Sequence, residues 1–501
     1  MPQAMDVLLR RYFRYRQWRI DKVVANVSLY QNRLLKKILV RQQGSEYGQR
    51  YNFSRIKDYA DFQSAIPIIK YEDIVDTILE MMDGRDNALV TARVEWFAKS
   101  SGTIAGRSKF IPVTKNYLIN GHLKCTWATA SAIYNEDPTA RLFADKNLIM
   151  GGSLEDLGGG RTVGDISAIM LKNFPKIGRR FSTPSFEVAL DPDWDKKIKY
   201  IAQHCTEERV SLLGGVPTWT MVLFKEILAH TGASNISEVW PHLKSYLHGG
   251  IGFEPYRKSF REYLPSEKVV FREIYNATEG YFAIQNSKDE DGMLLLCDHQ
   301  IFYEFIPYEE YKNSNPSVLT VDQVELDQLY VMVITNSSGL YRYVVGDVVE
   351  FVSVAPYKLK VRGRTEQYIN VFGEEVMLSN TDQALTTVCR RQAAEVRDYT
   401  VAPVFMLADS KGGHEWLIEF IKAPENITAF AAELDKALRQ INSDYDAKRY
   451  KNMAMDPLVI TQLSSGTIEK WQRKHKRFGG QNKMPRLKND RTIVEWLLSY
   501  K

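Results

Sequence analysis

Three short polar segments, far apart in the chain, combine residue types that suit a bound nucleotide. They span residues 100–109, 275–280 and 341–347. The first offers hydroxyls, glycine backbone and a cation to a polyphosphate. The second sets an aromatic ring beside a hydroxyl and a carboxylate, and the third ends in a carboxylate for ribose hydroxyls. Each alone is a weak signal, but together they predict a site where ATP activates another molecule.

The first segment contains Ser100, Ser101, Gly102 and Thr103, with Lys109 a little further on. It does not match the Walker pattern, which opens into a helix, because strand-like residues flank it on both sides. We interpret it as a flexible turn whose N–H groups and hydroxyls wrap the β- and γ-phosphates, with Lys109 adding charge. A polar glycine-containing hairpin without a ligand is the alternative for this segment alone.

The second segment follows a strand-like run. Tyr275 is suited to stack on adenine, Thr278 to contact the α-phosphate, and Glu279 to hold Mg²⁺, which prefers carboxylate oxygen. Upstream, Gly249 and Gly250 follow another strand-like run, where missing side chains let a flat base approach the backbone. The alternative for both places is a strand end followed by a turn.

The third segment is β-rich and contains Arg342 and Asp347. An aspartate that accepts hydrogen bonds from two ribose hydroxyls is a recurrent device in nucleotide sites. The alternative is a hairpin aspartate, because Gly346 precedes it and this pair is common in turns.

Bulk composition favours a multidomain globular protein. The chain has 501 residues, 44% hydrophobic residues, 25% charged residues and a net charge of +5, which argues against a dedicated nucleic-acid binder. The cysteines and histidines lack ligand spacing, so no structural metal is predicted. The basic N-terminus lacks the features of a secretory signal, and no apolar run is long enough to span a membrane. We expect a cytoplasmic monomer.

The elements that must position these segments predict an α/β fold. Strand-like and helical runs alternate from about residue 91 to 363, and the later strands follow one another closely enough to be antiparallel. After residue 364, helices over 380–394 and 427–446 and strands over 397–407, 415–421 and 458–463 predict a compact α+β domain. We therefore expect a large multi-sheet domain at 1–363 and a small domain at 364–501, with a hinge near 362–366.

The N-terminal residues 5–43 predict a basic amphipathic helix with apolar residues such as Leu8, Leu9, Tyr12, Phe13 and Trp18 at helical spacing. We expect this face to pack on the protein body. A membrane or nucleic-acid surface is the alternative.

Together the segments resemble the adenylate-forming superfamily of acyl-CoA synthetases, peptide-synthetase adenylation domains and luciferases. Within it, the chain is most similar to the auxin-responsive acyl acid–amido synthetase family, known best from plants. The Ser-Ser-Gly-Thr, Tyr-x-x-Thr-Glu and Tyr-Arg-x-x-x-Gly-Asp segments match in order and spacing. Residues 466–469 and 481–486 look like that family's Gly-Thr-Phe-Glu and Gln-Tyr-Lys-Thr-Pro-Arg elements. This chain is shorter than the plant proteins, and residues 363–366 look more like the hinge of the wider superfamily.

The resemblance implies a reaction in two halves. A carboxylate first attacks the α-phosphate of Mg·ATP to give an acyl-adenylate and pyrophosphate, and an amino acid amine then displaces AMP. It implies ATP and Mg²⁺ as cofactors, and a small carboxylic acid and an amino acid as partners. The resemblance also implies that Thr278, Glu279 and Lys483 serve the chemistry. It implies that Lys483 swings over the site with the small domain and that Arg364 reaches the nucleotide from the hinge. An acyl-CoA ligase and a non-catalytic relative that binds nucleic acid or membrane are the alternatives.

Overall fold

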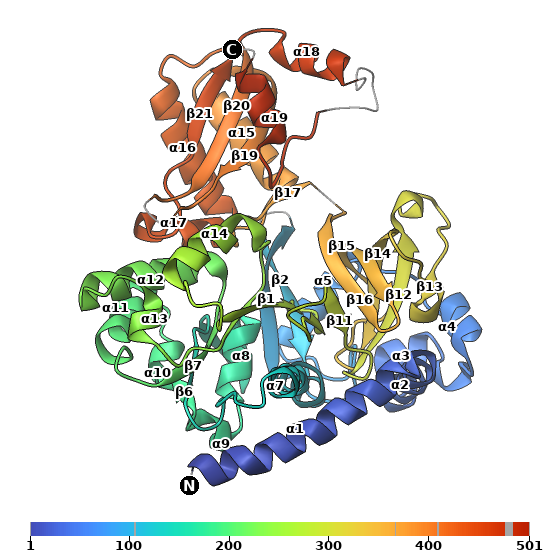
Figure 1. Cartoon of the computed structure of the whole chain (residues 1–501). Coiled ribbons are helices and arrows are strands. Elements are labelled where there is room, and N and C mark those ends of the chain that lie inside the picture. Colours follow the sequence, from blue (N-terminus) through green and yellow to red (C-terminus); the bar gives the residue numbers. More distant parts are fainter. Residues whose placement is uncertain (1, 105–106, 366, 408–409, 476–483, 500–501) are drawn as a thin grey trace.

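The computed structural model describes residues 2–104, 107–365, 367–407, 410–475 and 484–499. A large body built on a long mixed sheet carries a smaller body formed by the C-terminal residues (Figure 1). This arrangement confirms the predicted α/β fold with a large multi-sheet domain and a small α+β domain.

The long sheet joins an antiparallel half to a parallel half. Its strand order is β13-β12-β14-β15-β16-β11-β10-β9-β8-β7-β3-β6. The pairs from β13 to β9 are antiparallel, as predicted for the later strands, and those from β9 to β6 are parallel. The strands are β3 (Lys146–Ile149), β6 (Ser182–Thr183), β7 (Val210–Gly214), β8 (Ser245–His248), β9 (Val270–Asn276), β10 (Tyr281–Ile284), β11 (Met293–Leu295), β12 (Ile301–Pro307), β13 (Leu319–Thr320), β14 (Leu329–Asn336), β15 (Tyr343–Val354) and β16 (Tyr357–Arg364).

Helices pack against the parallel half. Leu213 of β7 and Tyr246 of β8 share one apolar core with Phe224, which lies on the helix over residues 217–231. The short, almost continuously apolar run of β7 is typical of a parallel strand buried on both faces. These helices are α11 (Trp194–His204), α12 (Pro217–Thr231), α13 (Ile236–Val239) and α14 (Glu254–Tyr263). The preceding helices are α8 (Ile166–Lys172), which packs in another core, α9 (Lys176–Arg179) and α10 (Phe186–Ala189).

A smaller sheet of order β2-β1-β5-β4 carries the first polar segment. The strands β1 (Trp96–Ile104) and β2 (Arg107–Val113) pair antiparallel, with Ser100 opposite Lys109. The predicted strands on both sides of this segment are confirmed, but residues 100–103 lie within β1 rather than in the predicted turn. Among the described residues the next element is the strand β2, not the helix of a Walker loop. The partners are β4 (Leu154–Gly158) and β5 (Arg161–Gly164).

The predicted N-terminal helix is two helices. α1 (Pro2–Val24) and α2 (Val27–Gln42) are separated because Asn26 has a non-helical φ of −144°. Phe13 is buried against α7 (Lys124–Glu136), but Tyr12, Tyr15 and Trp18 are 44%, 53% and 49% exposed. The expectation that the whole aromatic face packs on the body is thus wrong, since the packed stripe runs through Phe13 and Ile20 instead. The remaining helices of this body are α3 (Glu46–Arg50), α4 (Tyr59–Ala65), α5 (Val75–Met82) and α6 (Lys115–Tyr117).

The C-terminal body is a sheet of order β19-β20-β21 with helices on both faces. Trp416 and Ile418 of β20 face one apolar core, whereas Leu417 faces another, as the alternation of a strand requires. The predicted helix over 427–446 is divided, because the Asn442 side chain accepts hydrogen bonds from the N–H groups of Asp444 and Tyr445 and starts a new helix. The elements are β17 (Tyr368–Ile369), β18 (Val376–Met377), α15 (Leu378–Arg391), β19 (Glu395–Val404), β20 (Gly413–Lys422), α16 (Ile427–Ile441), α17 (Ser443–Arg449), β21 (Val459–Leu463), α18 (Thr467–Lys474) and α19 (Thr492–Leu498).

Among the described residues, no helix is both long enough and apolar enough to cross a bilayer. Cys125, Cys205, Cys297 and Cys389 are all free thiols, the first three of them buried.

Candidate active site

Elements of both bodies line one cavity of about 490 Å³. The large body contributes residues of β1, β9, β15 and β16, and the small body contributes α17. In Figure 1, α17 lies at the edge of the small body that faces the large one. Ser100, residues 273–279 and Asp347 all line this cavity, so the fold brings the three polar segments together.

Asp347 is held on both of its oxygens. The Tyr275 hydroxyl donates to Oδ2 at 2.5 Å, and Nε of Arg364 donates to Oδ1 at 2.9 Å. Arg364 also contacts Glu375 at 3.3 Å. Burial alone would lower the pKa of Arg364, but the carboxylates of Glu375 and Asp347 raise it above its usual value. Arg364 is therefore a fixed cation on the wall of the cavity, and Asp347 has a fixed orientation.

Tyr275 is buried, and its ring packs against Phe282 at 4.7 Å between centroids. Burial, followed by the charge of Asp347, raises the pKa of its hydroxyl well above the usual range, so the hydroxyl stays a donor. The described contacts make Tyr275 a positioning residue for Asp347, and its predicted stacking on adenine stays a prediction.

Thr278 and Glu279 form a second polar pair at the cavity. The Thr278 hydroxyl donates to Oε2 of Glu279 at 2.5 Å. The backbone carbonyl of Glu279 accepts hydrogen bonds from the Tyr117 hydroxyl at 2.6 Å and from Nδ2 of Asn336 at 3.2 Å. Burial raises the pKa of Glu279, which is 6% exposed. A cation bound here would stabilise the ionised carboxylate against this burial.

The first segment reaches the cavity through Ser100 and its neighbour Lys99. Lys109 lies beside this wall, with Nζ 5.8 Å from the centre of the Tyr71 ring, and its charge acts on Glu279. The side chains of Ser101, Gly102 and Thr103 and the whole of Lys483 lie outside what the structure describes. Their predicted contacts therefore stay predictions.

The two predicted glycines differ. Gly250 lines the cavity and has a φ of 82°, a conformation that favours glycine. Gly249 has another place: a Cβ on it would lie 2.4 Å from the carbonyl oxygen of Ile274. Close packing of β8 on β9 thus explains Gly249 without a nucleotide.

The structure also gives Arg342 a place other than the predicted one. Its Nε donates to both carboxylate oxygens of buried Glu304, at 3.0 and 3.1 Å. Its Nη1 donates to the backbone carbonyls of Gln63 and Ile66. Arg342 precedes β15 and has a φ of 46°, and its side chain joins α4 to β12 rather than lining the cavity. We therefore leave Arg342 out of the nucleotide contacts.

Sequence reasoning missed a group of charged residues on the cavity wall. They are Lys99, Asp165, Glu375, Asp444 and Lys448. Asp165 precedes α8 and accepts a hydrogen bond from the N–H of Ser153. Asp444 and Lys448 lie on a short helix without any recognisable motif. An i, i+4 pair of opposite charge is ordinary on exposed helices, so no sequence signal separates it from a solvated face.

The donor set of the cavity fits Mg·ATP. Hydroxyls of Ser100 and Thr278 and the guanidinium of Arg364 suit phosphate oxygens, and Asp347 suits ribose hydroxyls. Among the described residues, no three or more His, Cys, Asp or Glu side chains are grouped to hold a metal ion. Proteins commonly hold Mg²⁺ with one or two carboxylates and substrate phosphates, so Glu279 alone is a sufficient protein ligand.

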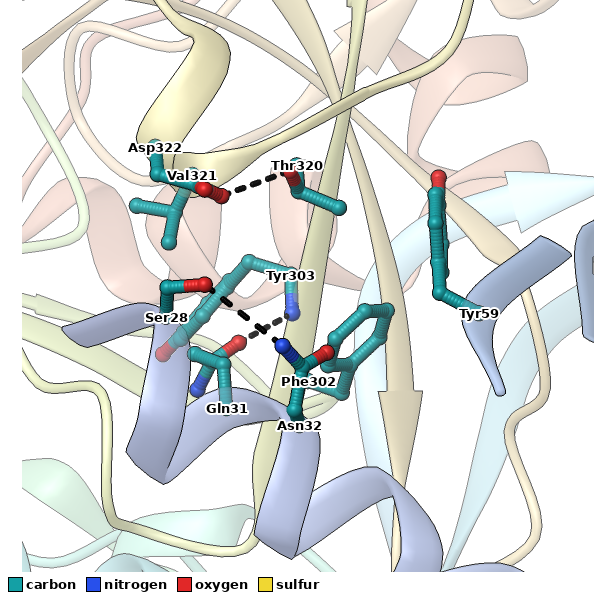
Figure 2. Close-up of a pocket in the computed structure, with 9 residues that line it drawn as sticks. All are labelled: Ser28, Gln31, Asn32, Tyr59, Phe302, Tyr303, Thr320, Val321 and Asp322. Carbon is teal, nitrogen blue, oxygen red and sulfur yellow. Dashed lines mark hydrogen bonds between the residues drawn. The ribbon is translucent and has the colours of Figure 1, made fainter. Parts of the chain in front are cut away.

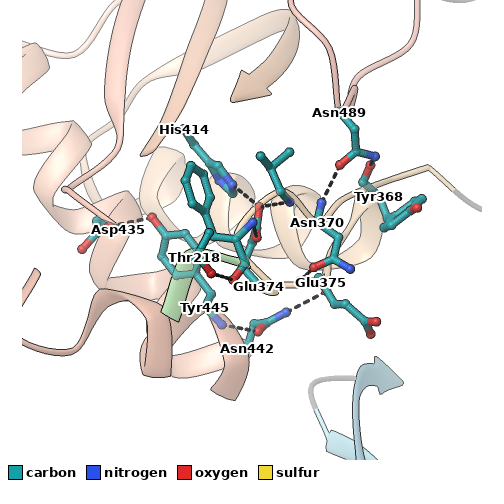
Figure 3. A network of polar contacts seen from close by, with 12 residues as sticks. Thr218, Tyr368, Asn370, Glu374, Glu375, His414, Asp435, Asn442, Tyr445 and Asn489 are labelled. Atoms are coloured by element: carbon teal, nitrogen blue, oxygen red, sulfur yellow. Dashed lines mark hydrogen bonds and ion pairs between the residues drawn. The ribbon is translucent and has the colours of Figure 1, made fainter. Parts of the chain in front are cut away.

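A buried network fixes the loop over residues 370–375, which joins β17 to β18 and contacts both bodies. Figure 3 shows Glu374 between His414 of β20 and the backbone of its own loop. Its carboxylate accepts hydrogen bonds from the N–H groups of Val371 and Phe372 and contacts Nε2 of His414 at 2.8 Å. Asn370 of this loop donates from Nδ2 to the carbonyl of Gly250 at 3.0 Å. The loop is thereby tied to both bodies where it borders the cavity.

A second, smaller cavity of about 120 Å³ lies between α2 and β12 (Figure 2). Gln31 lies beside it, and its amide is saturated by the backbone. Nε2 donates to the carbonyls of Cys297 and Ile301, and Oε1 accepts from the N–H of Tyr303. None of the predicted site residues lines this cavity, which we interpret as a packing gap under α2.

Three family models match the chain in order. Residues 16–202 and 163–269 match the GH3 family N-terminal domain, 294–364 match the GH3 family central domain, and 379–492 match the GH3 family C-terminal domain.

Named relatives match over nearly the whole length. Indole-3-acetic acid-amido synthetase GH3.3 of Arabidopsis thaliana is 22% identical, covering 93% of this chain and 89% of that protein. Jasmonoyl--L-amino acid synthetase GH3.5 of Oryza sativa subsp. japonica is 24% identical and covers 94% of both. The solved structure of GH3.15 acyl acid amido synthetase superposes with a TM-score of 0.61 at 17% identity, covering 96% of this chain and 95% of that chain.

Proposed function

Because the chain belongs to the GH3 family, we propose that it is an acyl acid–amido synthetase that uses ATP to activate a carboxylic acid and transfers the acyl group to an amino acid. The predicted family and the predicted ligase activity are both confirmed by the similarity to named amido synthetases. ATP use follows from the adenylate-forming fold.

One observation carries the assignment to this cavity. Ser100, the Thr278–Glu279 pair and the triad of Tyr275, Asp347 and Arg364 come from distant parts of the chain and line a single cavity. Structural ion pairs are scattered through any fold. A hydroxyl wall suited to phosphates, a buried carboxylate suited to Mg²⁺ and an oriented aspartate suited to ribose lie together in one cavity.

We assign the residue roles accordingly. Asp347, oriented by Tyr275 and Arg364, accepts the ribose hydroxyls, and Gly250 borders the base. The segment of Ser100, Ser101, Gly102 and Thr103, with Lys109 behind it, holds the phosphates.

Thr278 contacts the α-phosphate, and Glu279 holds Mg²⁺ together with phosphate oxygens. When bound, this cation neutralises phosphate charge. The protein residues position the carboxylic acid near the α-phosphate and exclude water from the activated acid. From the family resemblance, we retain Lys483 as a cation that reaches the same place.

We make three further proposals, on the domain bounds, the cellular location and the oligomeric state. The division at residues 1–363 and 364–501 stays our proposal for the two domains, with Glu366 of the predicted hinge outside the described residues. The four free thiols support a reducing, cytoplasmic location. We also propose that the protein is a monomer.

The test is pyrophosphate release from Mg·ATP with a panel of aryl, indole and aliphatic carboxylic acids, each with and without pooled amino acids. Acid-dependent release together with an amide product is expected. Release that needs coenzyme A and gives a thioester would instead make the protein an acyl-CoA ligase. Protein that binds ATP but releases no pyrophosphate with any acid would contradict the proposed activity.

A further inference from the structure

Asp444 and Lys448 present two opposite charges to the cavity without neutralising each other. They lie one turn apart on α17, where such side chains are neighbours. Elsewhere in the chain this spacing gives ion pairs, for example between Glu469 and Arg473. Among the described residues, no ion pair within 4.0 Å joins Asp444 to Lys448 or either of them to another charged residue.

The carboxylate of Asp444 is also without a donor. Its Oδ2 is shielded from solvent and has no hydrogen-bond partner among the described residues. A buried unpaired carboxylate oxygen is costly unless a ligand supplies a donor. The ammonium of Lys448 lies 5.1 Å from the centre of the Trp219 ring, where the ring holds a cation without satisfying its hydrogen bonds.

The surroundings of Asp444 explain its titration. Burial, then the charges of Glu375 and Asp165, raise the pKa of Asp444 to about 7, although Lys448 and Lys99 oppose this rise. Burial also lowers the pKa of Lys448. A carboxyl group that titrates near neutral pH can take up and release a proton during turnover.

We propose that Asp444 and Lys448 form the site for the acceptor amino acid, where Lys448 holds its carboxylate and Asp444 accepts a proton from its ammonium group. A zwitterion carries both charges one carbon atom apart, which matches two unpaired opposite charges on adjacent helical positions. The same cavity contains the proposed ATP residues, so the amine enters next to the activated carbonyl. This inference rests on the proposed function and adds the acceptor site to it.

In the transfer step, the amino acid nitrogen loses two protons, and Asp444 accepts the first of them. The ammonium group gives one proton to the ionised Asp444 and becomes a neutral amine. Its nitrogen lone pair forms the C–N bond to the carbonyl carbon, and the bond from that carbon to the phosphate oxygen of AMP breaks. The second proton passes from nitrogen to the phosphate of the departing AMP, and Asp444 then returns its proton to solvent.

The experiment separates the two half-reactions. Acid-dependent exchange of pyrophosphate into ATP measures adenylation, and mass spectrometry measures the amide formed with the best amino acid of the panel. Asp444→Asn and Lys448→Met are compared with Asp446→Asn. Asp446 lies on the same helix, but it is half exposed and paired with Arg439. Thermal melting confirms that each variant is folded.

We expect Asp444→Asn to lower the ratio of amide formation to adenylation at least 30-fold. In the wild type, transfer at saturating amine rises as the pH passes through about 7, because Asp444 loses its proton there. Asp444→Asn should lack this rise. Lys448→Met should raise KM for the amino acid at least 10-fold, yet change KM for the corresponding amino acid amide, which has no carboxylate, less than 2-fold.

Equal amide-to-adenylation ratios in Asp444→Asn and Asp446→Asn would overturn the proton-accepting role. An equal rise in KM for the amino acid and for its amide in Lys448→Met would overturn the carboxylate site. A wild-type enzyme that adenylates an acid and uses coenzyme A but no amino acid would also overturn this inference while leaving adenylation intact. Absence of acid-dependent exchange in the wild type would overturn the proposed function itself.

Discussion

Two arginine–carboxylate pairs lie beside the same strand, β15, and they differ in what surrounds them. Arg342 and Glu304 are 4% and 0% exposed, and the guanidinium is surrounded by carboxylate and backbone carbonyl oxygens. Arg364 and Asp347 are 21% and 8% exposed and line the cavity. The first pair joins elements of the large body, whereas the second lines the cavity.

The difference shows that residue type and position in a motif do not fix a role. Both arginines lie near the third polar segment, and both pair with a carboxylate. The two pairs differ in whether their other polar groups face protein atoms or face the cavity. Breaking the Arg342–Glu304 pair should therefore lower the free energy of unfolding and leave ATP binding unchanged. Breaking the Arg364–Asp347 pair should weaken ATP binding and change the stability little.

The largest effect is expected from Arg342→Leu. This change leaves Glu304 buried without its cation, and breaking such a pair costs about 3–5 kcal/mol. Urea denaturation should show this loss in the free energy of unfolding. The folded fraction should bind ATP with the wild-type Kd, measured by calorimetry.

Two controls sharpen this result. Arg439→Leu removes an exposed pair with Asp446 and should cost less than about 1 kcal/mol. Arg342→Leu combined with Glu304→Met removes both charges and should recover most of the lost stability. A weakened affinity for ATP in folded Arg342→Leu would return Arg342 to the nucleotide site.

The next effect is expected from Asp347→Ala. Loss of the ribose acceptor should raise the Kd of ATP about 30–100-fold, equivalent to about 2–3 kcal/mol. The free energy of unfolding should change by about 1 kcal/mol or less, because water in the cavity can hydrate Arg364 in place of the lost carboxylate. Calorimetric titration and urea denaturation measure the two quantities on the same preparation. An unchanged Kd with a large loss of stability would make this pair structural like the other.

The sequence predicted the family, the α/β fold and some of the polar residues that line the large-body wall of the cavity. Thr278, Glu279 and Asp347 were identifiable because each lies in a short motif; Thr278 and Glu279 lie in the turn between β9 and β10, and Asp347 lies on β15. Arg342 was misplaced because its left-handed backbone lies just outside the strand, so its side chain does not follow that alternation. The break at Asn442 was missed because the apolar pattern continues across it.

Asp444 and Lys448 were unpredictable for a different reason. Their neighbours across the cavity, Lys99 and Asp165, are hundreds of positions away, and only the docking of α17 against the large body brings these charges together. A pattern within one helix carries no information about the surface that the helix faces.

The smallest effect, and the finest test of the comparison, is Tyr275→Phe. The ring keeps its packing against Phe282, but Asp347 loses one donor at Oδ2. A single hydrogen bond contributes about 1 kcal/mol, so the Kd of ATP should rise about 3–10-fold with little change in kcat. Tyr341→Phe is the matched control, because its buried hydroxyl donates to the carbonyl of Leu89 away from the cavity. It should lower the free energy of unfolding by a similar amount and leave the Kd of ATP unchanged. Equal effects of the two substitutions on the Kd would mean that the Tyr275 hydroxyl does not orient Asp347 for the nucleotide.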